Sequence, residues 1–462
     1  MKFKLKKRTA IAAIIFAVLF ISSLIAGIVV SVSFIPKNTE IVCADGTRIT
    51  SVATSGFRDG AYYSTFGGKI YGTDDDGDET DCFDLEEFSV NTYGTQVGHI
   101  SSVFTVTGFD GLFAVGGDNY LYRFLTEGGL SFKERVRLSG SFVTATYGDG
   151  TLYCLTKSNA YYTIFKYDAS EISAGYTEKG FVYLSDGLTS KVKTAAGDES
   201  VALTLAKGLY VTSMTIKDGY LYLIHTGGLI RMKDDFALNR YGYDRPDGFY
   251  ENGGLQIGSD GSIYIDPEYF DSSDYACFYN SFGGSCYVGD TDTFYFITPE
   301  NAVVSAKRDY IDERCGKIGV KVGNLKTEDT GVELSESPAD YTDALIFDLA
   351  TDMGYVRHKN SSKITAIDFS GMKVAFVAQA EFDISFMATD KSGENLYIVY
   401  HNVNETSSSE TKVVKKLEVG KQIKSGFYRS LRTVLFVLAA VTFLTALVLI
   451  LCAASDKVSA YT

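Results

Sequence analysis

The sequence predicts an antiparallel all-β domain that is flanked by a membrane-spanning helix at each end. The chain has 462 residues, with 45 Gly, 32 Tyr and 31 Phe but only five Pro. Short runs rich in Tyr, Val, Ile, Phe and Thr are bounded by Gly, Asp, Asn and Ser, which is typical of strands joined by tight turns. Two long uncharged apolar segments lie near the ends of the chain. We therefore expect residues 36–428 to form the all-β part.

The first apolar segment covers residues 10–35, and the second runs from Val434 to Ala453. At a rise of about 1.5 Å per residue, each is long enough to cross a hydrocarbon core of roughly 30 Å. The first is also longer than the apolar region of a signal peptide, which has about 7 to 15 residues. We predict an uncleaved signal anchor over residues 10–35 and a second transmembrane helix over residues 429–454.

The basic residues beside the two segments predict the orientation, although the two flanks disagree. Five basic residues precede the first segment, which favours a cytoplasmic N-terminus. The flank before the second segment also favours the cytoplasm, since it holds Lys421, Lys424, Arg429 and Arg432. The leading helix usually dominates, and long domains cross the membrane largely regardless of charge. We expect a two-pass protein of the cell membrane, with membrane lipid as a partner, cytoplasmic tails at residues 1–9 and 455–462, and an extracytoplasmic domain.

The region between the spans is acidic. Residues 9–431 contain 56 Asp and Glu against 36 Lys and Arg. Proteins bind nucleic acid largely by neutralising its phosphates with Lys and Arg. We therefore expect no nucleic acid partner.

A loose repeat selects among the all-β folds. One unit reads Val211-Thr-Ser-Met-Thr-Ile-Lys-Asp-Gly-Tyr-Leu-Tyr-Leu-Ile-His, then Thr-Gly-Gly and Leu229-Ile-Arg-Met, and related units start at Val103 and Thr144. Asp-Gly supplies the positive φ that a two-residue hairpin turn requires, so each unit is a small meander. Such sheets must stack on one another, and radial stacking of four-stranded sheets leaves only short edges exposed.

This reasoning predicts a β-propeller. At roughly 40 to 50 residues per blade, residues 36–428 suffice for seven or eight blades. Two packed β-sandwich domains are the alternative, because strands separated by regular turns also suit that fold.

The repeat resembles that of the β-propeller superfamily, in which xDGxLYxL followed by a short return strand recurs once per blade. The resemblance is to degenerate NHL-like or PQQ-like propellers, and it covers most of residues 55–420. The chain has no Trp, whereas the usual WD40, YWTD, PQQ-quinoprotein and sialidase signatures contain one. The resemblance therefore implies a fold, and it carries over no catalytic or ligand-binding residue.

One pair of cysteines is a candidate disulfide. Cys277 and Cys286 flank the turn-rich stretch Phe-Tyr-Asn-Ser-Phe-Gly-Gly-Ser, which is able to form a hairpin that brings them together. Six of the seven cysteines lie outside the second span, an even number that suits an oxidising compartment. The chain has no C-x-x-C pattern, so nothing favours a zinc ribbon or a redox site.

A run of carboxylates offers a weak calcium candidate. Seven Asp and Glu fall within residues 74–84, and the oxygens of Asp74, Asp76 and Asp78 are ligands of the kind that calcium prefers. The run does not fit an EF-hand, because Gly72 and Phe83 stand where that loop requires acidic ligands. A solvated hairpin turn is the alternative, and we expect neither a metal nor another cofactor.

Tyrosines gather in an insertion-like region over residues 234–283. Their aromatic faces and polar tips suit sugars and protein partners, although strand tyrosines also serve packing alone. Functional surfaces favour loops that are longer than their neighbours. The candidate recognition surface is therefore Tyr241, Tyr243, Tyr250, Tyr269 and Tyr275.

No catalytic pattern is found in the chain: there is no G-x-S-x-G elbow, Walker loop or H-E-x-x-H. We predict no enzyme but a protein- or ligand-binding scaffold, accessory to a transporter or envelope complex, with a membrane or envelope protein as its partner. Two anchors would raise its effective concentration toward such a partner. The alternatives are a propeller enzyme of lyase or lactonase type and a ligand sensor.

Overall fold

The computed structural model comprises two compact units, residues 1–38 with 417–462, and residues 39–416. It describes residues 2–36, 39–43, 46–54, 60–74, 76–157, 162–182, 189–194, 200–204, 210–234, 255–257, 263–265, 275–279, 282–318, 325–339, 344–348, 350–359, 361–380, 383–401 and 413–458.

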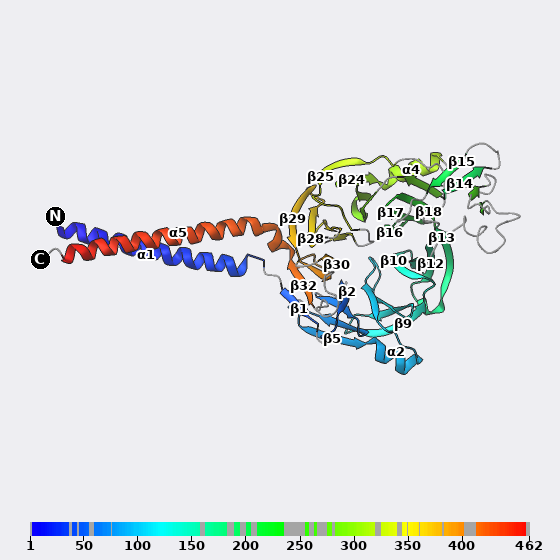
Figure 1. Cartoon of the computed structure of the whole chain (residues 1–462), viewed down its shortest axis with the longest axis horizontal. Coiled ribbons are helices and arrows are strands. Elements are labelled where there is room, and N and C mark those ends of the chain that lie inside the picture. The colour runs from blue at the N-terminus through cyan, green and yellow to red at the C-terminus, as the bar shows by residue number, and fades with distance from the viewer. Residues whose placement is uncertain are drawn as a thin grey trace. The chain divides into compact units, whose positions relative to one another are not determined.

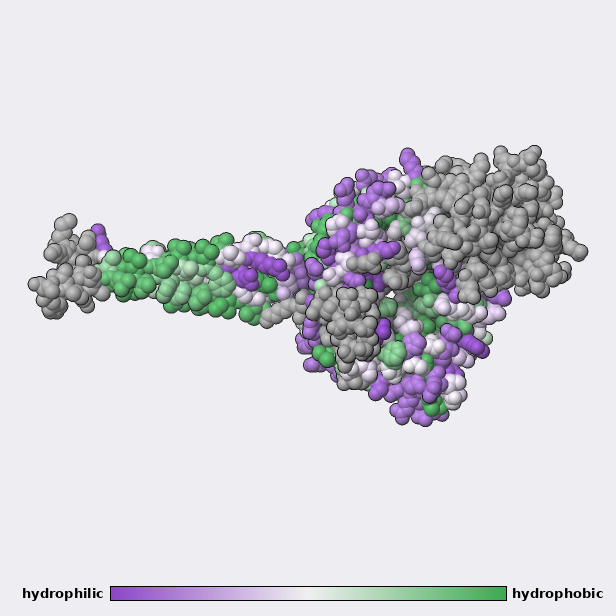
Figure 2. Space-filling model, in the orientation of Figure 1, coloured by the Kyte–Doolittle hydropathy of each residue, from purple (hydrophilic) through white to green (hydrophobic). Residues whose placement is uncertain are grey.

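The first unit is a pair of helices, α1 (Lys2–Ser33) and α5 (Val419–Val458). Both are long and apolar enough to cross a membrane, over Arg8–Ser33 and Val419–Cys452. Helix α5 begins at Val419, before the boundary that we expected at residue 429, because its first turns are helical but polar. The helices lie side by side, and the ring centroids of Phe20 and Phe443 are 5.2 Å apart. Figure 2 shows their surface as largely hydrophobic.

Small residues allow α1 and α5 to approach closely. Ser23 on α1 and Ala439, Thr442 and Ala446 on α5 are buried. A Cβ added at Gly27 would meet the ring of Phe436 at 3.1 Å. Small residues therefore allow the two helices to pack closely, as they also do between the helices of membrane proteins.

Replacing Gly27 by Leu is expected to separate the two helices, because the ring of Phe436 leaves no room for a branched side chain. The measurement is the yield of a disulfide between Phe20→Cys and Phe443→Cys under mild oxidation of the detergent-solubilised chain. We expect the yield to fall severalfold with Gly27→Leu. Gly426→Leu is the matched control, since nothing lies within 4 Å of an added Cβ there. An equal yield in both variants would show that the helices do not pack through Gly27.

The second unit is a seven-bladed β-propeller, as the repeat predicts (Figure 1). Each blade is a four-stranded antiparallel sheet. Blade 1 consists of β2 (Ile49–Thr54), β3 (Ala61–Thr65), β4 (Lys69–Thr73) and β5 (Glu79–Asp84). Blade 2 consists of β6 (Ile100–Phe104), β7 (Leu112–Gly116), β8 (Tyr120–Leu125) and β9 (Ser131–Arg137). Blade 3 consists of β10 (Ser141–Gly148), β11 (Thr151–Lys157), β12 (Tyr162–Asp168) and β13 (Tyr176–Val182).

The remaining blades follow in chain order. Blade 4 consists of β16 (Val211–Lys217), β17 (Tyr220–His225), β18 (Gly228–Lys233) and β21 (Tyr275–Tyr279). Blade 5 consists of β22 (Gly284–Val288), β23 (Thr293–Ile297), β24 (Ala302–Lys307) and β25 (Glu328–Glu333). Blade 6 consists of β26 (Leu345–Asp348), β27 (Met353–Arg357), β28 (Lys363–Asp368) and β29 (Lys373–Gln379). Blade 7 consists of β30 (Asp383–Thr389), β31 (Asn395–His401), β32 (Val413–Glu418) and β1 (Thr39–Val42).

The ring is closed by pairing the first strand with the last. Strand β1 adds to the outer edge of blade 7, with Ile41 opposite Val414. The innermost strand of each blade contacts that of the next: β30 meets β2, β2 meets β6, and the contacts continue from β10 through β16, β22 and β26 back to β30. Phe104 of β6 stacks on Phe142 of β10 at 4.6 Å, which completes the circle. The alternative of two β-sandwich domains is therefore wrong.

Asp-Gly turns join the first and second strands in two of the three clearest repeats. In the repeat that starts at Val103 the strands are joined by a longer connection, because β6 ends at Phe104 and β7 begins at Leu112. Asp149 and Gly150 have φ of 51° and 77°, and Asp218 and Gly219 have φ of 51° and 76°. Each pair forms a two-residue hairpin turn, since Gly148 pairs with Thr151 and Lys217 with Tyr220. Two successive positive φ values are the geometry that Asp-Gly tolerates best.

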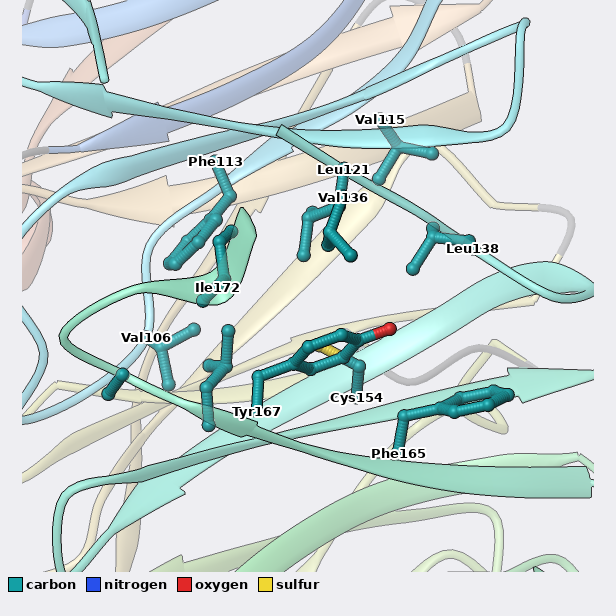
Figure 3. Close-up of a cluster of buried hydrophobic side chains, with 12 residues drawn as sticks. Val106, Phe113, Val115, Leu121, Val136, Leu138, Cys154, Phe165, Tyr167 and Ile172 are labelled. Atoms are coloured by element: carbon teal, nitrogen blue, oxygen red, sulfur yellow. The ribbon is translucent and has the colours of Figure 1, made fainter. Parts of the chain in front are cut away.

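The cores lie between neighbouring blades. The second strand of every blade carries, among its first three residues, an aromatic side chain that is at most 1% exposed: Tyr62, Phe113, Tyr153, Tyr222, Phe294, Tyr355 and Tyr397. Figure 3 shows the core of blades 2 and 3, where Phe113 and Val115 face Tyr167 and Ile172. Many of the tyrosines therefore serve to pack neighbouring blades against each other.

An eighth four-stranded sheet comes from two insertions, one between blades 3 and 4 and one within blade 4. It contains β14 (Thr189–Thr194), β15 (Ser200–Thr204), β19 (Leu255–Ile257) and β20 (Ile263–Ile265). Strands β14 and β20 pair in parallel. The connections elsewhere hold α2 (Leu85–Tyr93), α4 (Arg308–Ile318), η1 (Ile172–Ala174) and η2 (Gly289–Thr291).

Hydrogen bonds and ion pairs to a shared carboxylate connect successive blades, and we call each such group a clamp. In blade 3, Tyr153 donates to Asp234 of blade 4 at 2.7 Å, and Lys166 lies 3.8 Å from the same carboxylate. In blade 4, Tyr222 and Arg231 donate to Asp312 at 2.6 and 2.8 Å. The same arrangement thus recurs: a second-strand Tyr and a third-strand cation converge on one carboxylate from the next blade.

Candidate functional site

A cavity with a volume of about 1190 Å³ lies inside the ring. Five of the seven innermost strands contribute to its wall: β2, β6, β10, β26 and β30. A cavity of this size is large enough for a small molecule or an extended segment of a partner chain.

Hydroxyl groups and phenylalanine rings are prominent in this wall, beside aliphatic side chains. The hydroxyls belong to Thr54, Ser101, Ser102, Thr105, Thr107, Ser141, Thr144, Ser385 and Thr389, and the rings to Phe104, Phe142, Phe347 and Phe386. All four rings are half-buried, so part of each remains accessible. Apolar surface with scattered hydrogen-bonding groups suits an uncharged ligand with polar edges.

The charged groups of the wall are largely occupied by internal contacts. The guanidinium of Arg357 donates to the main-chain carbonyls of Ile384 and Ser385. His358 is buried, with Nδ1 2.9 Å from the carbonyl of Glu336 and Nε2 2.7 Å from the hydroxyl of Thr365. A carbonyl can only accept, so Nδ1 carries the proton and Nε2 accepts. Burial lowers the pKa of His358, which keeps it a neutral structural residue.

A smaller cavity of about 250 Å³ adjoins the first at the C-terminal ends of the innermost strands. The two cavities share five wall residues: Thr54, Thr105, Thr107, Phe347 and Thr389. Asp348 and Asp390 also line it, and both are buried. Burial raises the pKa of Asp348, and the nearby charge of Asp390 adds to the effect. Both carboxylates already accept hydrogen bonds from their own turns, Asp348 from Thr351 and Asp390 from Asn395.

Another buried histidine provides a pH test of the fold. His225, at the end of β17, is 2% exposed, and its Nδ1 accepts a hydrogen bond from the Gly227 N–H at 3.0 Å. Burial lowers the pKa of His225 to about 4. This pKa lies below the ordinary value near 6.5, so the unfolded chain binds a proton at His225 more readily than the folded chain does. The folded protein therefore keeps its full stability above pH 6.5 and loses stability as pH falls toward 4.

The free energy of unfolding is therefore expected to fall by about 3 kcal/mol through His225 alone between pH 6.5 and 4. His225→Gln keeps a hydrogen-bond acceptor but does not titrate, so its stability should decline by about 3 kcal/mol less over this range. Urea unfolding of the full chain in detergent, followed by tyrosine fluorescence at several pH values, measures both slopes. Parallel slopes for the two proteins would contradict a buried neutral His225.

The calcium candidates form a tight turn between β4 and β5. The Asp78 N–H donates to Oδ1 of Asp74 at 2.9 Å, and the side chains of Asp76 and Asp78 are exposed. Gly77 has φ of 91°, and an added Cβ would lie 2.9 Å from Ile41. The turn is thus shaped by packing against β1. Among the residues whose positions are described, no group of three or more His, Cys, Asp or Glu is arranged to hold a metal ion.

The hairpin expected between Cys277 and Cys286 does not form. Cys277 is in β21, the outermost strand of blade 4, whereas Cys286 is in β22, the innermost strand of blade 5. The turn-rich stretch between them is a connection from one blade to the next. Cys286 carries a free thiol and is buried.

Most of the candidate recognition surface lies outside the described residues. This is the case for Tyr241, Tyr243, Tyr250 and Tyr269. Tyr275 is in β21, where it pairs with Met232. The proposed surface stays a prediction.

The residues that line the central cavity carry no motif that singles them out in the sequence. They come largely from the first strands of five blades, such as Ser101 and Ser102 in β6 and Thr144 in β10. The available signal was the Ser and Thr content of these strands compared with the aromatic second strands. Their convergence depends on closure of the ring, which no local pattern encodes.

No family model and no curated protein is similar enough to the chain to match it. Among solved structures, the chain is similar to one described as the structure of U3-55K, with 9% sequence identity and a TM-score of 0.48. The match covers 84% of this chain and 99% of that chain. No functional residue is carried over from it.

Proposed function

We propose that this protein is a membrane-anchored, extracytoplasmic binding scaffold whose central cavity receives an uncharged ligand or segment of a partner. The partner is a membrane or envelope protein, and the scaffold is accessory to a transporter or envelope complex. The observation that carries the proposal is the cavity of about 1190 Å³ with its wall of hydroxyls and half-buried phenylalanine rings.

The wall chemistry favours binding over catalysis. Asp383 is the one carboxylate among the described residues that line the central cavity. Lyase and lactonase chemistry needs convergent carboxylates or histidines, with or without a metal. His358 has both ring nitrogens hydrogen-bonded within its own blade region, so it is a poor proton carrier.

Attachment at both ends supports a scaffold. The chain enters the ring at β1 and leaves it at β32, and these strands pair with Thr39 opposite Lys416. The helices that follow in both directions are long and apolar enough to span a bilayer. A domain held by two spans meets other membrane proteins at a high effective concentration.

A cavity-blocking variant tests the proposal. Thr105 is exposed and lines both cavities, so Thr105→Trp should fill the passage between them. Thr177, on the outermost strand of blade 3, is also exposed, and Thr177→Trp is the matched control. The tagged full chain is purified from its native membrane in mild detergent, and bound proteins and small molecules are quantified by mass spectrometry.

We expect a stoichiometric partner or ligand with the unaltered chain and with Thr177→Trp, and at least about a tenfold loss with Thr105→Trp, given the 1–3 kcal/mol cost of overpacking a filled site. Retention with Thr105→Trp would exclude the cavity as the binding site. A chain that always purifies alone would contradict the scaffold.

A further inference from the structure

The register of the helix pair places two arginines beside apolar turns of α1. Gly27 of α1 lies against Phe436 of α5, and Phe34 stacks on Tyr428 with ring centroids 4.9 Å apart. Arg429 and Arg432 lie between these two contacts on α5. The facing stretch of α1, residues 28–33, is Ile-Val-Val-Ser-Val-Ser. Both arginines therefore start from a level of α5 where the neighbouring helix is still apolar.

The helix pair provides no carboxylate to neutralise these cations. Neither α1 nor residues 419–452 of α5 contains an Asp or Glu. Glu418, just before α5, already pairs with Lys421 at 2.7 Å. Within the part of the chain that the structure describes, no ion pair is found for Lys424, Arg429 or Arg432.

The basic residues also share one face of α5. At about 100° per residue, Lys421, Lys424, Arg429 and Arg432 fall within an arc of about 140°. Phe427 and Phe34 are exposed aromatic side chains at the same level. Aromatic and basic side chains at the end of an apolar helix are typical of the headgroup level, where long cations extend toward lipid phosphates. Figure 2 shows the hydrophobic surface of the helix pair giving way to hydrophilic residues.

We propose that Arg429 and Arg432 form a binding site for the phosphate headgroups of anionic phospholipids. Guanidinium groups bind phosphate through two parallel hydrogen bonds, and the lipid tails would cover the exposed apolar residues of α1 beside them. Such a site explains how a basic flank that favours the cytoplasm is tolerated on the other side of the bilayer. The inference rests on the membrane anchoring in the proposed function.

The test uses the full chain in vesicles with equal amounts of phosphatidylglycerol and phosphatidylcholine. Carbonate extraction first checks anchoring. The chain is then purified in mild detergent, and the ratio of the two lipids retained is measured by mass spectrometry. The variants are Arg429→Gln with Arg432→Gln, and Arg429→Lys with Arg432→Lys. Lys326→Gln with Lys373→Gln, on the exposed surface of the propeller, is the charge-matched control.

We expect retained phosphatidylglycerol to exceed its share in the vesicles, and the glutamine pair to lower this enrichment by about fivefold for each arginine removed. The lysine pair keeps the charge but not the paired hydrogen bonds, so its enrichment should lie between those of the unaltered chain and the glutamine pair. The propeller control should keep the full enrichment. An unchanged enrichment in the glutamine pair would overturn the site. Displacement of the lipid by about 10 mM inorganic phosphate, with the ionic strength and therefore the screening held constant, would also overturn it, because the arginines would then bind free phosphate. Release by carbonate would refute the anchoring itself, whereas retention without enrichment would refute the lipid site alone.

Discussion

Replacing Ile41 by Asp is expected to open the propeller ring. Ile41 lies in β1, the strand that closes blade 7, and is 4% exposed. It packs with Val414 of blade 7 and with Tyr63 and Tyr71 of blade 1. An ionised carboxylate there would lose these apolar contacts and its own hydration, at a cost of about 4 kcal/mol or more. We expect a large fall in the melting temperature of the full chain in detergent and rapid proteolysis near residue 38.

The next residue on the strand gives the matched control. Val42 is 65% exposed, so Val42→Asp places the same charge on the solvent side of β1. Its stability should stay within about 0.5 kcal/mol of the unaltered chain. Equal effects of the two substitutions would mean that β1 does not close the ring through its buried face.

Replacing Asp312 by Ala should weaken the contact between blades 4 and 5 and lower the free energy of unfolding. Asp312 of α4 accepts hydrogen bonds from Tyr222 and Arg231 of blade 4, and Arg308 lies 2.8 Å from its second oxygen. Loss of the carboxylate leaves the buried guanidinium of Arg231 without its ion-pair partner in the clamp, which costs about 3 kcal/mol. Denaturant unfolding of the full chain measures this loss.

Asp309 on the same helix is the control for this substitution. Its side chain is 91% exposed and lies 3.9 Å from Arg308, so Asp309→Ala should change the stability by less than about 0.5 kcal/mol. Comparable destabilisation by both variants would show that the effect comes from α4 as a helix and not from the clamp.

The fold could be predicted because its determinants are local and repeated. Asp149-Gly150 and Asp218-Gly219 adopt the positive φ values that their hairpins require. The aromatic residue of xDGxLYxL, such as Tyr153 or Tyr222, is fully buried in the strand that follows the turn. Turn chemistry and alternation along a strand act over a few residues, so they are visible in sequence.

The contacts between blades could not be predicted, because they join residues that are far apart in the chain. The return strands of the clearest repeats each contain a basic residue, Arg123, Lys166 or Arg231. Nothing local shows that Lys166 lies near Asp234 or that Arg231 pairs with Asp312. The expected Cys277–Cys286 hairpin failed for the same reason: a turn-rich stretch joins two blades as readily as two paired strands.

The central cavity also depends on ring closure. Its wall combines residues from β2, β6 and β10 with residues from β26 and β30, near the other end of the domain. Individual Ser and Thr residues in these strands look like ordinary strand residues. Only the closed geometry distinguishes a wall residue such as Thr105 from a surface residue such as Thr177.

Labelling of Cys82 on intact cells tests the central claim most directly. Cys82, in β5, is an exposed thiol of the propeller, whereas Cys43, Cys154 and Cys286 are buried. The test uses a chain in which Cys277, Cys315 and Cys452 are replaced by Ser. An extracytoplasmic propeller predicts that a membrane-impermeant maleimide modifies this chain on intact cells and that adding Cys82→Ser abolishes the modification. Modification of Cys82 only after the cells are permeabilised would place the propeller in the cytoplasm and contradict the account.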